Sequence, residues 1–399
     1  MIGEEFKKQT GFNTKAIHVG STPKPLGDPV ITPIVTSTIY KYDTVNNDKK
    51  YEYTRVGNPT RDALEECLAS LDNGKFALTF ASGQSATLSI SWLLNPHDHI
   101  LVSRDLYTGT QGLLSTLREK RYLDVQYFNP TDQIELRNCL KPNTKMIWLE
   151  SPTNPHLVVV DLKAIADIVH QYSKDIIVVV DNSFLSAYLQ KPLDFGADIT
   201  MYSLTKFMNG HSDVLMGAAV MKCEKLYNNL RRIQINLGAV PSAYDCYLMH
   251  RSLKTLGVRM EKHHENSIKV AKFLQKHPKI AKVVHPALPD HPQYELSLKQ
   301  TYGHSGIITF YLNGDFNDVK KFAKNLKCIS IAKSLGGVES TIVFPFAMMY
   351  ERYTEQERIE MGITENFARF SVGIEDGDSI INDLDQALNS LPGGTVSKL

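Results

Sequence analysis

The sequence has few cysteines, and no two of them lie close together. The five are Cys67, Cys139, Cys223, Cys246 and Cys328, a spacing that excludes a CxxC metal or redox motif. Because the count is odd, a closed set of disulfides is not expected, and we expect the protein in a reducing, intracellular compartment.

The chain also lacks long apolar runs and an excess of charge of either sign. No run is long enough to span a bilayer, and the first ten residues, MIGEEFKKQT, lack the apolar core of a secretory signal. Lys and Arg total 44 against 43 Asp and Glu, so the formal net charge is +1. Such a balance gives no long-range attraction to nucleic acid or anionic membranes, and we expect neither as a partner.

The last three residues carry the one targeting signal. Ser397-Lys398-Leu399 matches the tripeptide that the peroxisomal import receptor binds, and it follows the turn-rich stretch Leu391–Gly394. We therefore expect a cytoplasmic or a peroxisomal protein. The alternative is a chance match in an organism that does not use the signal.

A length of 399 residues predicts more than one domain. The N-terminal stretch contains several prolines and little periodicity, which predicts an extended arm over residues 1–55 that reaches a neighbouring subunit. We expect a first domain over residues 56–255 and a smaller C-terminal domain over residues 256–399.

Short apolar strands alternate with amphipathic helices up to about residue 222. Asn58-Pro59 is expected to begin a helix, since Asn caps and Pro fits the first turn, and Gly74 is expected to end it. Such an order predicts an α/β domain with a mostly parallel sheet covered on both faces. The expected strands are 76–80, 99–103, 145–150, 176–181 and 197–203, with a helix over 162–172.

The pattern changes after about residue 224. A long helical region is expected to run through Leu253 to about Lys276, followed by strands over 306–312 and 367–373. This mixture predicts a smaller α+β domain.

Three features of the first domain carry chemistry. Asp181 ends the most hydrophobic strand, at the edge of a parallel sheet where ligands bind, although a capping role would also explain it. Ser203-Leu204-Thr205-Lys206 follows the next strand and offers two hydroxyls for an anion and one amine for a carbonyl. Ala81–Ala86 places a Gly-containing turn at a helix start, where backbone N–H groups bind phosphate.

Each feature alone is weak, but together they form the set that a pyridoxal cofactor needs. The lysine forms a Schiff base with the cofactor's aldehyde. The aspartate keeps the pyridine nitrogen protonated, because opposite charges at close range favour both charged forms. The helix start and the hydroxyls hold the phosphate. The sequence therefore predicts pyridoxal 5'-phosphate as the cofactor.

Over nearly its whole length the sequence resembles the pyridoxal-phosphate enzymes of cysteine and methionine metabolism, in particular the cystathionine γ-lyases. The resemblance implies the type I fold of pyridoxal-phosphate-dependent transferases, which is that of aspartate aminotransferase, and a homotetramer of active-site-sharing dimers. The matching segments are Tyr51–Thr60, Ala81-Ser82-Gly83, Glu150–Pro155, Val179–Asn182, Ser203–Asp213, Ser334–Ser340 and Arg369–Gly373.

The resemblance also implies roles for individual residues. Lys206 is the Schiff-base lysine and moves protons at the substrate carbons, Asp181 pairs with the pyridine nitrogen, and Tyr107 stacks on the ring and is a candidate base. The implied phosphate ligands are Gly83, Gln84, Ser203 and Thr205, with Tyr53 and Arg55 reaching the phosphate of the neighbouring subunit. The implied ligands of the substrate carboxylate or ring hydroxyl are Asn154, Ser334 and Arg369. His211 and Asp213 resemble a metal pair, but a structural role is expected and no metal.

Three positions depart from the family pattern. The Arg expected after the turn Tyr107–Thr110 is replaced by Gly112, and the Glu expected before Ser334 is Lys333. The stretch Pro345–Tyr350 also differs. The first two positions face the distal end of the substrate in the family, so Lys333 reverses a charge in the substrate pocket.

The resemblance implies a carbon–sulfur lyase acting on an amino acid. Its substrate is cystathionine, cleaved to cysteine, 2-oxobutanoate and ammonia, or a related compound such as cysteine. The first alternative is β-elimination, giving pyruvate, ammonia and homocysteine or sulfide. The second is γ-replacement, as in cystathionine γ-synthases and sulfhydrylases. The retained Lys206 and Asp181 argue against a non-catalytic protein that keeps the cofactor for stability alone.

Overall fold

The computed structural model describes residues 11–21, 29–45, 49–350 and 353–392, and the chain forms two compact units. The larger unit takes the chain up to Asn154 and Val160–Gly257; the smaller takes Pro155–Val159 and the chain from Val258 onward. The division after Gly257 lies two residues from the expected boundary. Ser397-Lys398-Leu399 lies outside the described residues, so the peroxisomal signal stays a prediction.

The larger unit contains a seven-stranded sheet in the order β1-β7-β6-β5-β4-β2-β3. Every neighbouring pair is parallel except the two made by β7, which runs antiparallel to β1 and β6. The five strands expected from the sequence are confirmed, whereas β3 and β7 were not expected. The bounds are β1 Phe76–Phe80, β2 His99–Ser103, β3 Asp124–Phe128, β4 Thr144–Glu150, β5 Ile177–Asp181, β6 Ile199–Ser203 and β7 Gly217–Met221.

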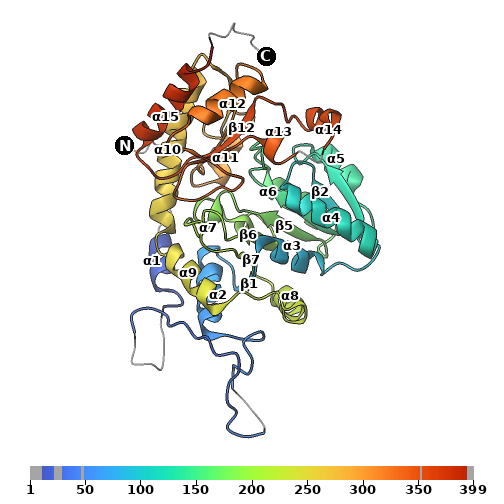
Figure 1. Ribbon diagram of the computed structural model, residues 1–399. Helices are drawn as coiled ribbons and strands as arrows, with labels where there is room; N and C mark the ends of the chain where they lie inside the picture. The colour runs from blue at the N-terminus through green and yellow to red at the C-terminus, as the bar shows by residue number, and fades with distance from the viewer. Residues whose placement is uncertain (1–10, 22–28, 46–48, 351–352, 393–399) are drawn as a thin grey trace. The chain divides into compact units, whose positions relative to one another are not determined.

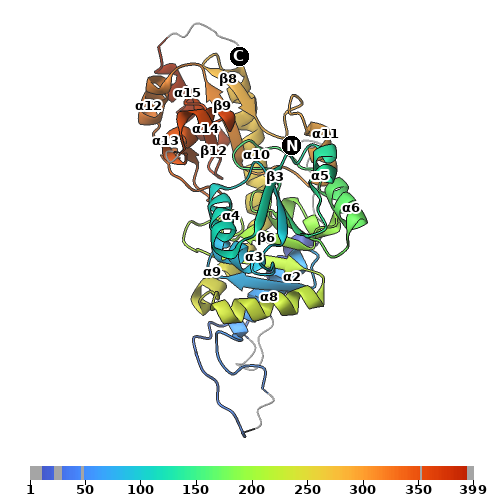
Figure 2. The same ribbon diagram turned by 90° about the vertical axis from the view of Figure 1, so that its right-hand side faces the viewer.

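Helices cover both faces of this sheet. Strand residues alternate between two apolar clusters, one shared with α3, α4 and α8, the other with α5 and α6. Figure 2 shows α4 on one side of β3 and α5 and α6 on the other. The bounds are α1 Phe12–His18, α2 Pro59–Leu71, α3 Gly83–Ser91, α4 Thr108–Arg121, α5 Gln133–Cys139, α6 Leu162–Tyr172, α7 Ser186–Leu189, the 3-10 helix η1 Pro192–Asp194, α8 Glu224–Leu237 and α9 Ala243–Leu253.

Helix α2 begins as expected and ends differently. The Asn58 side chain accepts hydrogen bonds from the backbone N–H groups of Thr60 and Arg61. At the other end, Asn73 adopts the left-handed conformation, with φ of 54°, while the Gly74 N–H donates to the Ala69 carbonyl. Gly74 is needed for another reason: a Cβ there would overlap a Val220 methyl group, so glycine lets the helix end approach the sheet.

The smaller unit contains a five-stranded sheet in the order β10-β11-β12-β9-β8, mostly antiparallel. Its inner face packs on α10, α12 and α15, so the expected α+β domain is confirmed (Figure 1). Strands β9 and β12 were expected, and β8, β10 and β11 were not. The bounds are α10 Leu256–Lys276, β8 Ile280–Val284, α11 Tyr294–Gln300, β9 Ile307–Leu312, α12 Phe316–Asn325, β10 Ser330–Ile331, β11 Thr341–Val343, α13 Pro345–Met348, α14 Glu355–Glu360, β12 Phe367–Ser371 and α15 Gly377–Asn389.

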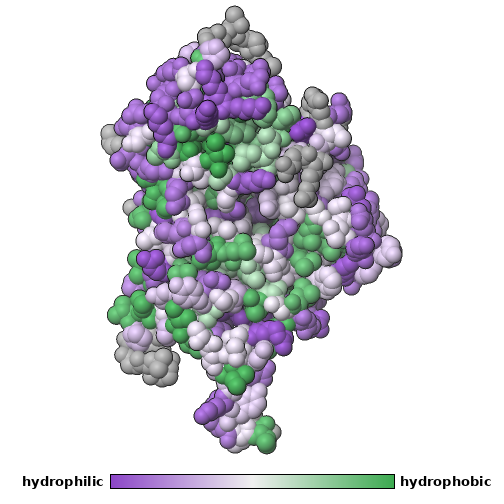
Figure 3. Space-filling model, viewed as in Figure 1, coloured by the Kyte–Doolittle hydropathy of each residue, from purple (hydrophilic) through white to green (hydrophobic). Residues whose placement is uncertain are grey.

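The described part of the arm carries apolar side chains in the open. Between α1 and α2 the chain forms one isolated bridge, from Ile39 to Tyr53. Val30, Ile39 and Val45 are 90%, 69% and 98% exposed. Figure 3 shows hydrophobic atoms at the lower end of the view, where Figure 1 draws the arm. Of the helices described, none combines the length and the apolar character needed to cross a bilayer.

Candidate active site

Three neighbouring parallel strands end in polar residues at one edge of the larger sheet. Glu150 ends β4, Asp181 ends β5 and Ser203 ends β6, and Glu150 is the register partner of Asp181. Both residues are buried: Glu150 has 4% and Asp181 has 8% of its surface exposed. Because the sheet is parallel here, their side chains gather where its strands terminate.

Asp181 is tied to Ser203 through Ser183. The Asp181 Oδ1 atom accepts the Ser183 backbone N–H at 3.0 Å and its hydroxyl at 2.6 Å. The same hydroxyl accepts the Ser203 N–H at 2.7 Å. Burial raises the pKa of the Asp181 carboxyl, while the Ser183 hydrogen bonds and the Lys206 charge oppose that rise. The Ser183 hydrogen bonds and the Lys206 charge therefore favour the ionised form of Asp181, whereas burial opposes it.

Lys206 lies in the tight turn that follows β6. Its backbone N–H donates to the Ser203 carbonyl, and its carbonyl accepts the Gly210 N–H at 2.8 Å. The neighbouring Thr205 hydroxyl donates to the Met216 carbonyl at 3.2 Å and accepts the Met216 N–H at 3.1 Å. The Thr205 proton is thus directed to the backbone, which leaves Ser203 as the better placed of the two hydroxyls for an anion.

The start of α3 has the properties of a phosphate cradle. Ser82 caps the helix by accepting the Ser85 N–H at 3.0 Å. Within the described chain, no acceptor is found for the backbone N–H groups of Gly83 and Gln84, which lie in the first turn. A Cβ on Gly83 would lie 3.2 Å from the Ser203 hydroxyl oxygen, so the cradle is next to the end of β6.

A second glycine makes this approach possible. Gly217 begins β7, and a Cβ at that position would overlap the Ser82 carbonyl oxygen and crowd Gly83. The lack of space at Gly217 is enough to explain why this residue is a glycine, because any larger side chain is excluded. The helix start is therefore held close to the sheet by the smallness of Gly217.

Tyr107 immediately precedes α4. Its backbone N–H donates to Glu150 Oε2 at 2.9 Å. Its ring lies against Gly109, where a Cβ would overlap it, and the Gln84 side chain donates to the Gly109 carbonyl at 2.8 Å. The first turns of α3 and α4 are thereby linked through the Gln84 side chain.

Tyr53 and Arg55 lie together on the arm. The Arg55 guanidinium carbon is 5.5 Å from the centre of the Tyr53 ring, and its Nη1 donates to the Ile235 carbonyl at 3.0 Å. Both side chains are exposed. Asn154, at the end of the segment after β4, is buried, and its backbone N–H donates to Glu150.

The remaining substrate residues lie in the smaller unit. Arg369, on β12, is 2% exposed and donates from Nη2 to the carbonyls of Lys333 and Ser334, each at 3.3 Å. Lys333 and Ser334 are exposed in the segment between β10 and β11. Arg369, Lys333 and Ser334 therefore lie together in the structure. The two main-chain carbonyl oxygens orient the guanidinium group of Arg369.

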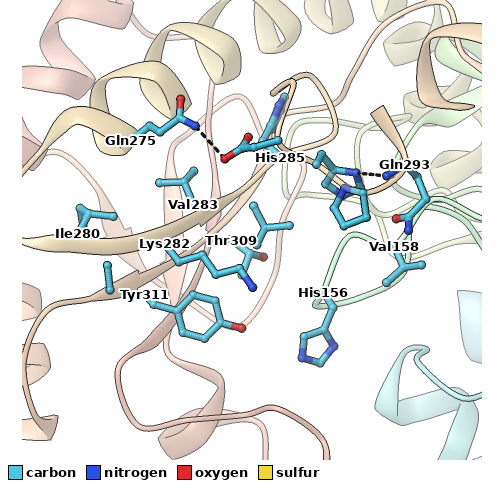
Figure 4. A pocket seen from close by; sticks show the side chains of 15 residues that line it. His156, Val158, Gln275, Ile280, Lys282, Val283, His285, Gln293, Thr309 and Tyr311 are labelled. Atoms are coloured by element: carbon cyan, nitrogen blue, oxygen red, sulfur yellow. Dashed lines mark hydrogen bonds between the residues drawn. The ribbon is translucent and has the colours of Figure 1, made fainter. Parts of the chain in front are cut away.

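A cavity of about 470 Å³ in the smaller unit contains none of the predicted site residues (Figure 4). Two pairs of its lining residues bind each other: Gln275 donates to Asp290, and the Gln293 N–H donates to His291. His211 and Asp213 both bond to Asn209, which supports a structural role. Within the described ranges, no cluster of His, Cys, Asp and Glu has the arrangement of a metal site.

Sequence reasoning missed four residues of this site: Ser82, Glu150, Ser183 and Gly217. The spacing of Ser183, two residues after Asp181, is typical of an Asx turn and offered a signal. Glu150 stands in a matching segment but had no role, because its bond to Tyr107 joins positions 43 residues apart.

The residues present fit pyridoxal phosphate. The N–H groups of Gly83 and Gln84, which have no acceptor within the described residues, lie beside Ser203 and suit a phosphate. The buried Asp181 carboxyl suits a protonated pyridine nitrogen. Lys206 supplies the amine, and its charge acts on Asp181. These groups come from the ends of the neighbouring strands β5 and β6 and from the start of helix α3.

Comparisons with known proteins agree with this chemistry. Residues 13–389 match the family model described as Cys/Met metabolism PLP-dependent enzyme. The chain is 45% identical to human (Homo sapiens) cystathionine gamma-lyase over 389 residues, covering 97% of this chain and 96% of that protein. It is 41% identical to cystathionine gamma-lyase from Dictyostelium discoideum over 379 residues, covering 95% and 97%.

Solved structures show the same fold. A cystathionine gamma-lyase from Micromonospora echinospora superposes with a TM-score of 0.91 at 36% identity, covering 96% of this chain and 99% of that one. MetB from Corynebacterium glutamicum superposes with a TM-score of 0.90 at 38% identity, covering 96% and 98%. The predicted fold, family resemblance and cofactor are confirmed: the protein belongs to the pyridoxal-phosphate-dependent enzymes of cysteine and methionine metabolism.

Proposed function

We propose that the protein is a carbon–sulfur lyase of trans-sulfuration. The reaction is the cleavage of cystathionine with water to cysteine, 2-oxobutanoate and ammonia. The observation that carries the proposal is the placement of Lys206 and Asp181 after adjacent strands, with the Lys206 charge acting on the buried carboxyl. The two cystathionine gamma-lyases to which the chain is 45% and 41% identical support this substrate.

Each residue has a defined task in this proposal. When bound, pyridoxal phosphate supplies an electron sink for negative charge that develops at the substrate α-carbon. Asp181, whose ionised form the Ser183 hydrogen bonds favour, holds the proton of the pyridine nitrogen. Lys206 moves protons at the substrate carbons. Tyr107 stacks on the ring, and the backbone of Gly83 and Gln84 binds the phosphate together with the Ser203 hydroxyl. The Thr205 hydroxyl donates to the Met216 carbonyl and is not available to the phosphate.

The planar guanidinium of Arg369 binds the substrate carboxylate in a bidentate manner. Its two bonds to the carbonyls of Lys333 and Ser334 fix its direction before substrate arrives. Asn154 and Ser334 complete the substrate-binding set.

The products of L-cystathionine distinguish the reactions. We expect 2-oxobutanoate and cysteine from the purified holoenzyme, and a Lys206→Ala variant that lacks both activity and the yellow absorbance of the lysine-bound cofactor. Pyruvate and homocysteine would establish β-cleavage instead. Turnover that requires an acylated homoserine and a thiol would establish γ-replacement. A wild-type protein without the yellow absorbance would exclude all three.

A specific observation favours β-elimination as a second candidate. Lys333 is exposed and its carbonyl accepts from Arg369, so an ammonium group is attached next to the proposed carboxylate ligand. Cystathionine carries an ammonium and a carboxylate at its distal end, and two unit charges at about 4 Å near a surface interact by about 4 kcal/mol. A fraction of this energy changes a product ratio tenfold.

Charge reversal tests the second candidate. If Lys333 sets the preference, Lys333→Glu shifts the ratio of 2-oxobutanoate to pyruvate by about tenfold, whereas Lys272→Glu, an exposed position on α10, leaves it unchanged. An unchanged ratio in Lys333→Glu would remove Lys333 from the account of specificity.

We also propose that the site is shared across a dimer within a homotetramer. Support comes from the exposed apolar residues of the arm and from Tyr53 and Arg55, which are exposed in one chain. Mixing unfolded Arg55→Ala and Lys206→Ala chains and refolding them would give hybrids with one intact site. Random pairing then restores about a quarter of wild-type activity. Absence of any restoration would place Arg55 outside a shared site.

A further inference from the structure

Glu150 is a buried acid that the proposed reaction does not use. It ends β4 directly beside Asp181, and 4% of its surface is exposed. No cation within the described residues forms an ion pair with it. Burying a carboxyl group without a cation is costly, so the position calls for a specific use.

The carboxyl group holds two backbone segments. Its Oε2 atom accepts the Tyr107 N–H at 2.9 Å, and the Asn154 N–H also donates to it. Tyr107 has no side-chain cap of its own on α4, so Glu150 provides the acceptor at this helix start. The bond connects the end of a rigid central strand to a residue 43 positions away.

This bond fixes the part of the backbone from which the Tyr107 ring projects. The ring lies against Gly109, and the Gly109 carbonyl is held by Gln84 at the start of α3. A parallel contact, from the Thr153 hydroxyl to Asp105 at 2.5 Å, secures the preceding loop. The backbone of Tyr107 is therefore held by Glu150, and Gly109, against which its ring lies, is held by Gln84.

The surroundings of Glu150 favour the uncharged form of its carboxyl group as the hydrogen-bond acceptor. Burial raises the pKa of the Glu150 carboxyl well above its usual value, and the neighbouring Asp181 charge raises it further. Two buried carboxyl groups on register partners of adjacent strands do not both ionise readily. The ionised form of Asp181 is favoured by the Ser183 donors and the Lys206 charge. The raised pKa favours the neutral form of Glu150, and an amide would reproduce the carbonyl acceptor of that form.

We propose that Glu150 is a positioning residue that sets the Tyr107 ring against the cofactor held by Asp181. The inference rests on the proposed stacking of Tyr107 on the cofactor. It assigns Glu150 no contact with substrate and no proton transfer to it.

A double-mutant cycle tests the proposal without measuring turnover. Affinity is obtained by titrating apoenzyme with pyridoxal phosphate, and orientation from the circular dichroism band of the bound cofactor. We expect Glu150→Ala and Tyr107→Ala each to weaken binding about tenfold and reduce the band, and the double variant to be no worse than Tyr107→Ala. Glu150→Gln should retain both properties within about twofold.

Other outcomes overturn the proposal. Additive losses in the double variant would mean that Glu150 acts independently of the Tyr107 ring. A Glu150→Gln variant as impaired as Glu150→Ala, with a shifted pH dependence of binding, would assign its effect to charge on Asp181. If Tyr107→Ala binds the cofactor normally, the stacking role fails together with this inference, whereas Lys206 and the lyase reaction are unaffected. Should Glu150→Ala not fold, Glu150→Asp, which withdraws the acceptor, takes its place in the cycle.

Discussion

Arg61 and Glu65 form a buried ion pair one turn apart in α2, with 3.9 Å between the guanidinium Nε and Glu65 Oε1. Arg61 also donates to the carbonyls of Thr54 and Arg55, so the pair anchors the segment that carries Tyr53 and Arg55. Glu65 in turn accepts the N–H and the hydroxyl of Thr79 on β1. The arm and the sheet are therefore connected through one salt bridge.

Removing the cation alone should be more damaging than removing both charges. Arg61→Met leaves Glu65 buried without its partner and should lower the free energy of unfolding by about 3–5 kcal/mol. Arg61→Met combined with Glu65→Gln should recover part of the loss, because the amide oxygen still accepts from Thr79. Chemical denaturation of the apoenzyme measures both, and a double variant less stable than the single one would contradict the expectation.

Glycine substitutions should separate the cofactor cradle from ordinary helix effects. Gly217→Ala forces the Ser82 carbonyl away from β7, so cofactor binding should weaken at least tenfold and stability should fall by about 1–3 kcal/mol. Gly112→Ala, an exposed helix position with nothing near its Cβ, should stabilise by about 0.5–1 kcal/mol and leave binding unchanged. Cofactor titration and thermal unfolding provide the comparison.

The Ser183 hydroxyl should control the ionisation of Asp181. Its hydrogen bond lowers the pKa of the carboxyl, so Ser183→Ala should raise that pKa and move the loss of cofactor affinity on acidification to higher pH. The variant also removes the acceptor of the Ser203 N–H. Ser183→Thr retains the hydroxyl and serves as the control. If cofactor affinity is lost at the same pH in wild type and in Ser183→Ala, this assignment is contradicted.

Buried histidines should make the smaller unit sensitive to acid. Burial lowers the pKa of His285 to about 3 and those of His263 and His264 to about 4. The His304 ring stacks on His264 and meets His285 edge-on. Since these groups bind protons more readily when unfolded, their contribution to stability is present above about pH 6.5 and is lost as the pH falls towards 4.

The expected slope is at most about 1.4 kcal/mol per pH unit for each histidine. His285→Gln should reduce the slope between pH 6 and 4, whereas His97→Asn, at an exposed position, should preserve it. Chemical unfolding, followed by backbone circular dichroism at several pH values across this range, measures the difference. An equal slope in His285→Gln and wild type would contradict the assignment.

The sequence predicts those parts of the fold that are continuous and apolar. The central strands ending at Asp181 and Ser203 are buried on both faces, so their hydrophobic runs stand out. Strand β3 lies at the sheet edge and alternates with polar residues such as Gln126, and β7 begins with Gly217 and small residues. Neither has a composition that separates it from a loop.

The site follows a similar division. Lys206 and Asp181 are recognisable because their residue types and strand-end positions suggest chemistry. Glu150 and Ser183 act through hydrogen bonds whose partners are determined only when the sheet assembles. The direction of the Thr205 hydroxyl towards Met216 likewise depends on the return of the chain in β7. Residue identity predicts the reactive groups, whereas tertiary hydrogen bonds select which of them are available.

The five residues Pro155–Val159 belong to the smaller unit although they interrupt the larger one. There the Pro155 carbonyl accepts the Thr309 hydroxyl, and the Leu157 carbonyl bonds to the His291 ring. A gene fragment that starts at Val258 would encode a C-terminal domain missing an integral piece, with both buried groups deprived of their acceptors. Neither unit can therefore be exchanged between homologues as a contiguous cassette, and recombination within this family is expected to succeed only when the 155–159 segment travels with its C-terminal partner.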